Sequence, residues 1–255
     1  MLSVVSGQLT EGIIVEQEQW ALKVRKLVNA DYTLHTSYFG PQDRTALLIH
    51  GGGESSSSKV HPLRIELAER GIGTLAVDHL GHGYTAGDIK KSSLKMRVEE
   101  VLSAIKAYPI VNLIGSVSMS MGGHVAIKLQ QILSFKAMVL IAPAVYTSSA
   151  YAVPFGQGFT DIIRQSGSWS DSHAWSVLEK FEGKLLVIIG ENDEVIPKGV
   201  IDKMMLITKP DVAKIIILKD VDHFVMTRLR EGEKKRLEST LGLISSTLID
   251  AANNA

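Results

Sequence analysis

Cysteine is absent from the 255-residue sequence, and neither sign of charge is in excess. Without cysteine there are no disulfides, thiolate zinc sites, iron–sulfur clusters or cysteine nucleophile, and the absence of disulfides fits a reducing compartment. The 27 Lys and Arg residues balance 27 Asp and Glu residues, so the formal net charge is zero. A nucleic-acid-binding protein needs surplus basic residues to neutralise phosphates, so we expect no nucleic-acid partner.

Long apolar segments are also missing. The longest apolar run, residues 137–145, is too short to span a bilayer and contains Pro143. The N-terminal segment has no basic residue before Lys23 and is interrupted by Gly7, which is unlike a secretory signal. We therefore expect a soluble cytoplasmic protein with no membrane span. The sequence carries no signal for an oligomeric state.

Short apolar runs alternate with amphipathic stretches along most of the chain. The runs are residues 45–49, 73–77, 111–115, 137–142, 185–190 and 214–218. Helical periodicity is found in residues 60–70, 92–107, 121–133, 198–207 and 228–249. Strands without polar alternation are typical of a sheet that helices cover on both faces, so the pattern predicts one α/β domain with a mostly parallel sheet. Residues 22–28 and 32–38 alternate in polarity, which predicts an antiparallel hairpin at one edge of the sheet.

An insertion at about residues 143–183 separates two of these strands. It holds seven of the chain's fifteen aromatic residues, namely Tyr146, Tyr151, Phe155, Phe159, Trp169, Trp175 and Phe181. A connection of this length is usually functional or disordered, and the aromatic content argues against disorder. We interpret it as a short cap over the carboxyl edge of the sheet, where open α/β sheets bind ligands. All of these aromatics except Phe181 are candidate substrate-binding residues, and packing of the cap onto the sheet is an equally good explanation for them.

The most informative stretch is residues 111–128, VNLIGSVSMSMGGHVAIK, in which an apolar strand leads through a tight turn directly into a helix. The turn resembles the nucleophile elbow G-x-S-x-G of the α/β-hydrolase superfamily, with Ser120 at the nucleophile position. Gly122 meets the need for a small residue after the nucleophile, whereas Ser118 replaces the first glycine of the pattern. The resemblance implies an α/β-hydrolase fold in which a strained backbone exposes the Ser120 hydroxyl.

The same resemblance assigns an oxyanion hole, a site that stabilises negative charge on the substrate oxygen. His50 is followed by three glycines directly after the apolar run 45–49, and glycines leave backbone N–H groups accessible. By resemblance, Gly52 supplies one N–H donor and Met121, the residue after the nucleophile, supplies the other. His50 is expected to organise the loop.

The acid and base of a catalytic triad follow the last two strands. Asp193 matches the acid position in the G-x-x-D-x-x-x-P pattern after run 185–190, with Glu191 and Glu194 as rivals. His223 lies in a D-H-F sequence after run 214–218, where the superfamily carries its catalytic histidine, and Asp222 is expected to shape that loop. His82 lies in a turn that resembles D-x-x-G-H-G, for which we expect a structural role.

Nucleophile, acid and base occur in the order Ser, Asp, His, as in α/β-hydrolases. The resemblance implies a serine hydrolase that forms an acyl-enzyme on Ser120 and needs no metal or organic cofactor. We expect a small-molecule carboxylic ester as substrate, small or extended with an apolar acyl or aryl group; thioesterase and lysophospholipase activities are the nearest alternatives. Two further alternatives use the same pocket without hydrolysis: a lyase or perhydrolase, and a ligand sensor that acts through movement of the cap.

Overall fold

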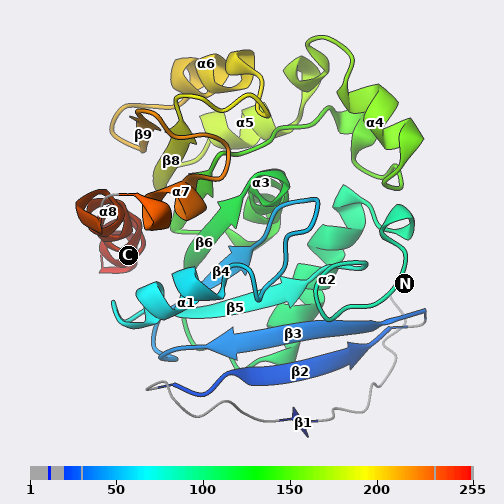
Figure 1. The fold of residues 1–255 in the computed structure, drawn as a ribbon, viewed down its shortest axis with the longest axis vertical. Helices are drawn as coiled ribbons and strands as arrows, with labels where there is room; N and C mark the ends of the chain where they lie inside the picture. The colour runs from blue at the N-terminus through cyan, green and yellow to red at the C-terminus, as the bar shows by residue number, and fades with distance from the viewer. Residues whose placement is uncertain (1–10, 13–19, 30, 233, 254–255) are drawn as a thin grey trace.

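A single twisted sheet runs through the molecule, as a computed structural model that describes residues 11–12, 20–29, 31–232 and 234–253 shows (Figure 1). Nine strands among these residues form it, in the order β1-β2-β3-β5-β4-β6-β7-β8-β9. The strands are β1 Glu11–Gly12, β2 Lys23–Val28, β3 Thr33–Phe39, β4 Thr45–Ile49, β5 Gly73–Asp78, β6 Leu113–Met119, β7 Ala137–Ile141, β8 Lys184–Gly190 and β9 Ala213–Leu218. From β5 to β9 the neighbouring strands in the sheet are parallel, so their carboxyl ends meet at one edge.

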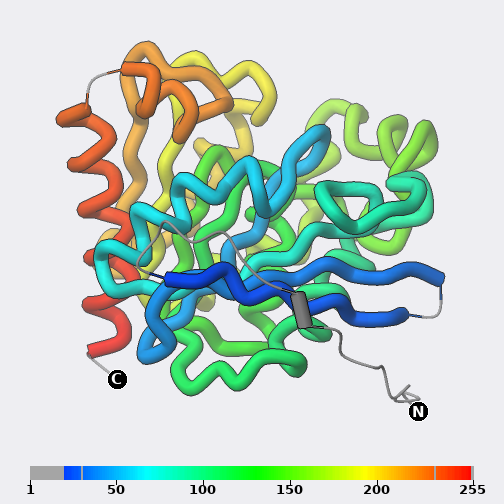
Figure 2. Tube along the Cα trace, turned by 60° about the horizontal axis from the view of Figure 1, so that its bottom comes forward, coloured from blue at the N-terminus to red at the C-terminus, as the bar shows by residue number. Residues whose placement is uncertain are grey.

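Helices cover both faces of the sheet. The α-helices are α1 His61–Ala68, α2 Leu94–Ala107, α3 Met121–Leu133, α4 Gln157–Ile163, α5 Ala174–Glu179, α6 Lys198–Ile207, α7 Val225–Glu231 and α8 Lys234–Asn253, and the 3-10 helices are η1 Ile89–Lys91, η2 Ser148–Ala150 and η3 Ser168–Asp171. Apolar residues of α1, α7 and α8 pack in one core, whereas those of α2, α3, α5 and α6 pack in the other. Figure 2 shows α8 along one side of the molecule. No helix in the described part of the chain is both long and apolar enough to cross a bilayer.

Burial on both faces explains why the strands lack polar alternation. In β8, Leu186 and Ile188 belong to the core beneath α8, whereas Leu185, Val187 and Ile189 belong to the core beneath α3 and α5. Successive side chains of a strand point to opposite faces, so a strand with two buried faces is apolar throughout. The predicted α/β architecture with a mostly parallel sheet is confirmed.

The N-terminal hairpin is confirmed as well. Strands β2 and β3 pair antiparallel, with Lys23 opposite Tyr38, and β3 then pairs antiparallel with β5. Strand β1 pairs with the outer side of β2. Residues 13–19, on which no prediction of structure falls, lie outside the described residues.

Two predicted boundaries are wrong. The run 111–115 marks only the start of β6, which extends from Leu113 to Met119 because two serines that look like loop residues are buried within the sheet. Ser118 is 0% exposed, and its hydroxyl donates a hydrogen bond to the carbonyl of Val139 on β7 at 3.3 Å. A hydroxyl that bonds to a neighbouring backbone carbonyl can be buried at little cost.

The helix predicted over residues 228–249 is instead two helices, α7 and α8. Gly232 ends α7 with φ −98° and ψ −141°, a conformation far from that of an α-helix. The amphipathic pattern continues across the break because both helices bury apolar residues in the same core, including Leu229 of α7 and Leu241 of α8. Periodicity therefore detects the shared buried face but not the end of α7 at Gly232.

The insertion between β7 and β8 begins beside the turn that follows β6, since the N–H of Ala144 donates to the carbonyl of Ser120 at 3.0 Å. It then runs along the first turn of α2, where Lys95 donates to Tyr151 and Phe155 donates to Ser92 through backbone hydrogen bonds of 2.9 and 2.8 Å. Its last helix, α5, contacts α3 and α6 and belongs to the helix layer of the sheet. In Figure 1 α4 lies farther from the sheet than α5.

Candidate active site

Ser120 occupies a strained turn between β6 and α3. Its φ of 50° and ψ of −120° lie outside the regions that non-glycine residues favour, at a cost of order 1–3 kcal/mol. Three backbone hydrogen bonds hold this conformation: the Ser120 N–H donates to Ile141 at the end of β7, and its carbonyl accepts from Gly123 in α3 and from Ala144. The predicted strained elbow is therefore present in the fold.

Gly122 allows α3 to start directly against β4. A Cβ at this position would lie 2.4 Å from the carbonyl oxygen of Ile49 and 2.7 Å from that of His50, closer than side-chain carbons approach such atoms. Only glycine avoids this collision without movement of the backbone. The turn at Ser120 and the glycine loop after β4 are therefore brought together by close backbone contact.

Three residues from different parts of the sequence meet at the carboxyl edge of the sheet. The ring nitrogens of His223 contact Asp193 Oδ2 at 2.8 Å through Nδ1 and Ser120 Oγ at 3.0 Å through Nε2. Ser120 follows β6, Asp193 follows β8 and His223 follows β9. A carboxylate only accepts hydrogen bonds, so Nδ1 of His223 carries the proton and Nε2 is left to accept one from Ser120.

The carboxylate of Asp193 is held in a fixed orientation. Its Oδ1 accepts backbone N–H groups of Val195 at 2.8 Å and Ile196 at 3.0 Å, and only 2% of the side chain is exposed. Burial raises the pKa of Asp193, but the hydrogen bonds from His223 and from these two backbone groups outweigh it and hold the pKa below the usual value of 3.8. Asp193 is therefore a carboxylate at neutral pH.

The rival acids lie elsewhere. Glu191 Oε2 accepts the backbone N–H of Asp220 at 3.1 Å, and the side chain of Glu194 is exposed. Asp222 accepts the N–H of Phe224 and pairs with Arg228 at 2.9 Å, so it shapes the loop beside His223 as expected. Among these acids, Asp193 is the one that contacts the histidine ring.

The glycine loop after β4 lies against the elbow. A Cβ on Gly51 would be 3.2 Å from Cβ of Ser120, and a Cβ on Gly52 would be 3.4 Å from the side chain of Met121. The two residues expected to donate the oxyanion N–H groups, Gly52 and Met121, are therefore adjacent in space.

Behind this loop lies a buried polar cluster that includes Arg97, a residue that none of the sequence motifs contains. The carbonyl oxygen of Gly51 accepts hydrogen bonds from His50 Nδ1 at 2.8 Å and from Arg97 Nη1 at 3.0 Å. Arg97 also contacts His82 Nε2 through Nη2 at 3.0 Å, and it is 0% exposed. Its place in an amphipathic helix looks like an ordinary charged surface position, so no local pattern identifies it.

Protonation within the cluster follows from its contacts. Burial and the neighbouring positive charge of Arg97 lower the pKa values of His50 and His82, so both rings are neutral at pH 7. Burial also lowers the pKa of Arg97, to about 10, which leaves it charged at neutral pH. Deeper in the cluster, His79 contacts Glu100 at 2.6 Å, and burial raises the pKa of Glu100 to about 7.

The aromatic residues of the insertion mostly contact the protein's own core. Phe155, Phe159 and Trp175 are each at most 8% exposed. The indole N–H of Trp175 donates to the carbonyl of Trp169 at 2.7 Å, and the two rings meet edge to face at 5.9 Å. These contacts account for the aromatic content by packing of the insertion onto the body of the protein.

Tyr151 and Tyr146 occupy different surroundings. The ring of Tyr151 lies 5.0 Å from the ammonium group of Lys128 in a cation–π contact. Tyr146 packs its ring 5.5 Å from that of His124, and its backbone N–H donates to His124 Nδ1. Because His124 follows Ser120 by four residues on α3, Tyr146 stands about one helical turn from Ser120.

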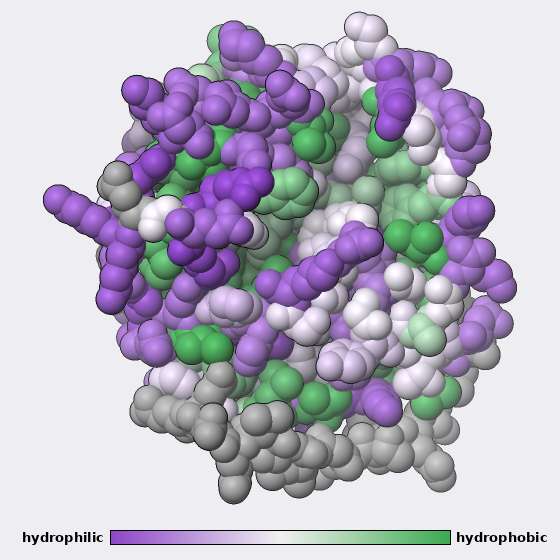
Figure 3. Space-filling view, in the orientation of Figure 1, coloured by the Kyte–Doolittle hydropathy of each residue, from purple (hydrophilic) through white to green (hydrophobic). Residues whose placement is uncertain are grey.

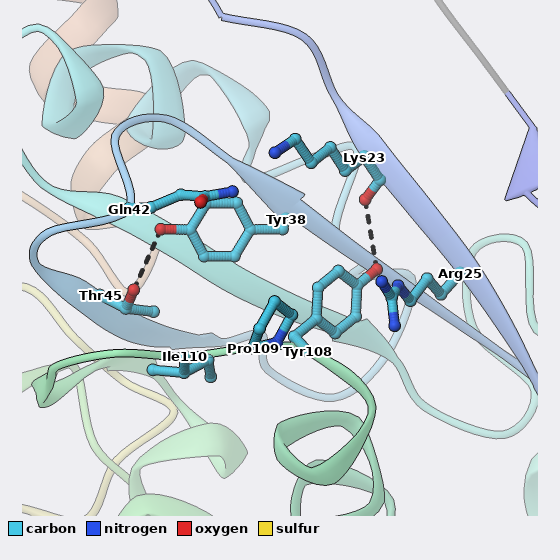
Figure 4. A pocket seen from close by; sticks show the side chains of 8 residues that line it. All are labelled: Lys23, Arg25, Tyr38, Gln42, Thr45, Tyr108, Pro109 and Ile110. Carbon is cyan, nitrogen blue, oxygen red and sulfur yellow. Dashed lines mark hydrogen bonds between the residues drawn. The ribbon is translucent and has the colours of Figure 1, made fainter.

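Two pockets elsewhere on the molecule do not include Ser120, Asp193 or His223 in their walls. One, of about 80 Å³, is lined by Tyr38, Thr45 and Tyr108 among others and lies where β4 begins, at the sheet edge opposite Ser120 (Figure 4). The other, of about 690 Å³, is lined by residues of the β2–β3 hairpin and of the segment between β5 and α2. Figure 3 shows apolar and weakly polar side chains gathered in the region between α7 and α4.

The fold and strand order define an α/β-hydrolase. Residues 40–171, just over half of the chain, match the family described as serine aminopeptidase, S33, and the chain belongs to this family of α/β-hydrolases. The match includes the glycine loop, the elbow and most of the insertion, and it ends before Asp193 and His223. No curated protein matches the chain.

Solved structures share the fold at low sequence identity. An esterase of Pyrococcus furiosus superposes with a TM-score of 0.67 at 16% identity, over 93% of this chain and 97% of that one. A monoacylglycerol lipase of Paleococcus ferrophilus gives 0.65 at 18% identity, over 86% and 99%. Est1E of Butyrivibrio proteoclasticus, with ferulic acid bound, gives 0.64 at 17% identity, over 89% and 98%. At these identities the likeness concerns the fold alone.

Proposed function

We propose that the protein is a serine hydrolase that cleaves a carboxylic ester or thioester through an acyl-enzyme on Ser120. The observation that carries this proposal is the contact of one imidazole ring with both Asp193 at 2.8 Å and Ser120 at 3.0 Å. A serine hydroxyl is a weak nucleophile until an adjacent base accepts its proton, and this arrangement supplies such a base.

In the proposed reaction, Ser120 Oγ attacks the substrate carbonyl while Nε2 of His223 takes the hydroxyl proton. Asp193 keeps the ring proton on Nδ1 and stabilises the imidazolium ion that forms. His223 then protonates the leaving alcohol or thiol as the tetrahedral intermediate collapses to the acyl-enzyme. Water repeats the sequence on the acyl group, with His223 again as the base, and releases the acid.

The negative charge on the tetrahedral oxygen would be stabilised by the N–H groups of Gly52 and Met121. Met121 is the first residue of α3, so its N–H is one of those at a helix start that lack an intrahelical partner. The partial positive charge of the helix N-terminus also favours an anion there. Removal of one such donor typically costs about 10²–10³ in rate.

We further propose that the chain forms one domain, with residues 143–183 as a cap that supplies an apolar wall for the acyl or aryl group. Tyr146 is the aromatic residue best placed to contact it, because the tyrosine packs on His124 about one turn from Ser120. The likeness in fold to an esterase, a monoacylglycerol lipase and a protein that binds ferulic acid supports an ester as the first substrate to test.

Labelling with a fluorophosphonate tests the activated serine directly. We expect intact-mass analysis to show one adduct on the wild-type protein and none on S120A, with both proteins folded by circular dichroism. A panel of p-nitrophenyl esters of graded chain length, matched thioesters and aminoacyl p-nitroanilides would then separate esterase, thioesterase and aminopeptidase activities. A folded wild-type protein without an adduct, or equal labelling of S120A, contradicts the proposal.

A further inference from the structure

Arg97 is a buried cation that makes no direct ion pair with any carboxylate of the described residues. It is 0% exposed, its guanidinium lies 5.1 Å from the ring of Phe155, and its hydrogen bonds go to the Gly51 carbonyl and the His82 ring. Burying a charge without an ion pair is expensive. The location of this charge therefore calls for an explanation beyond packing.

The Gly51 carbonyl shares a peptide group with the Gly52 N–H. No cis peptide bond occurs in the described residues, so this N–H points in the direction opposite to the carbonyl. The carbonyl is anchored on the α2 side by Arg97 Nη1 at 3.0 Å and His50 Nδ1 at 2.8 Å. The N–H consequently faces away from α2, while the glycine loop itself lies against Ser120 and Met121.

We propose that Arg97 is a positioning residue for catalysis: it fixes and polarises the Gly51–Gly52 peptide so that the Gly52 N–H stabilises the oxyanion. This inference rests on the proposed function of Ser120. A guanidinium that donates to a carbonyl makes a stronger hydrogen bond than a neutral donor does, and withdrawal of electrons from the carbonyl oxygen strengthens the N–H of the same peptide.

His82 holds Arg97 in this position. The guanidinium only donates, so Nε2 of His82 accepts from Nη2, and its Nδ1–H donates to the Leu80 carbonyl at 3.2 Å. His82, in the turn after β5, thereby orients the Arg97 side chain of α2, and Arg97 orients the glycine loop after β4. The D-x-x-G-H-G turn also contacts the loop after β4 directly, because the N–H of His79 donates to Nε2 of His50 at 3.4 Å. Arg97 is the side chain that reaches the Gly51 carbonyl from α2.

The chain contains a matched control. Arg64 of α1 is also buried, at 1% exposure, and its guanidinium also lies over an aromatic ring, that of Phe39 at 5.8 Å. It donates to the carbonyls and hydroxyls of Ser37 and Thr74 on β3 and β5, and none of its described contacts is with the glycine loop after β4. R64M and R97M therefore each remove one buried cation, and only R97M removes a contact of the Gly51–Gly52 peptide.

The test compares ester hydrolysis by wild type, R97M and R64M, together with inhibition by an alkyl boronic acid, which mimics the tetrahedral intermediate. For R97M we expect kcat to fall by about 10–10², within the range for weakening one oxyanion donor, with KM nearly unchanged and the boronic acid Ki raised by a similar factor. R64M is expected to lower the melting temperature while kcat stays within about twofold of wild type.

R97K is the second variant if R97M does not fold. Lysine keeps the charge and the stem but lacks the planar fork that bonds to Gly51 and His82 together, so we expect an intermediate loss in kcat. Wild-type kcat in folded R97M or R97K, or an equal loss in R64M, overturns the proposal for Arg97 while leaving that for Ser120 intact. A wild-type protein that fluorophosphonate does not label overturns both.

Discussion

Replacing Asp193 by asparagine tests the proposed triad, because both carboxylate oxygens of Asp193 already accept hydrogen bonds. The carboxylate now accepts two backbone N–H groups at Oδ1, from Val195 and Ile196, and the His223 ring at Oδ2. Asparagine has only one oxygen. If that oxygen stays with the two backbone donors, the NH₂ group faces Nδ1 of His223 and donates to it.

That orientation reverses the tautomer of the histidine. Nδ1 becomes the acceptor, so the proton moves to Nε2, which then faces Ser120 and no longer accepts the hydroxyl proton. The same exchange in a Ser-His-Asp triad lowers kcat by about 10⁴. Turning the amide restores the tautomer but leaves two backbone donors unpaired, at about 1–3 kcal/mol each. This penalty of about 2–6 kcal/mol corresponds to a factor of roughly 30 to 10⁴, so we expect kcat to fall by about 10²–10⁴.

The assay is steady-state hydrolysis of the best p-nitrophenyl ester at pH 7.5, with active sites counted by fluorophosphonate labelling. E191Q is the matched control, because Glu191 lies in the same loop and its side chain accepts only the N–H of Asp220 among its described hydrogen bonds. We expect E191Q to retain kcat within about threefold. A loss below tenfold in D193N, or a larger loss in E191Q than in D193N, would refute the assignment of the acid.

Three further outcomes follow from the packing and titration of particular residues. G122A places a Cβ 2.4 Å from the Ile49 carbonyl, so we expect about 1–3 kcal/mol lower stability in urea unfolding and slower labelling of Ser120; wild-type labelling would show that the close contact is dispensable. G242A adds a Cβ in α8 with no atom within 4 Å, so we expect about 0.5–1 kcal/mol higher stability, and a loss would contradict the open surroundings. Burial lowers the pKa of His124 from 6.5 to about 3, so the unfolded chain binds a proton between these values that the folded chain does not. The part of the free energy of unfolding that depends on neutral His124 is therefore complete above about pH 6.5 and is lost as the pH falls, by about 2 kcal/mol at pH 5. In H124Q the difference between the free energies of unfolding at pH 8 and pH 5 should be smaller by about this amount. An unchanged difference would exclude His124 as a contributor.

Local sequence patterns are enough to locate residues whose position depends on one strand or one turn. Apolar runs identify the strands because burial on both faces leaves no polar alternate, and the carboxyl ends of those strands place Ser120, Asp193 and His223 at one edge. The tight turn around Ser120 is visible as small residues between a strand and a helix. The end of α7 at Gly232 is also local, but the sequence did not predict it because the amphipathic periodicity continues across the break.

Pairings between distant segments are decided only by the tertiary structure. Three acids follow β8 within four residues, and the choice of Asp193 depends on the position of a ring thirty residues later in the chain. Arg97 looks like a surface charge of an amphipathic helix, and only packing reveals that its guanidinium reaches a carbonyl forty-six residues earlier. By itself the sequence determined the strands, the tight turn at Ser120 and the positions of Ser120, Asp193 and His223 after three of the strands, because each is encoded locally along the chain. The contacts between Arg97 and the glycine loop after β4 were decided by the packing of α2 against β5 and α3, since their energy arises between segments that only the folded chain brings together.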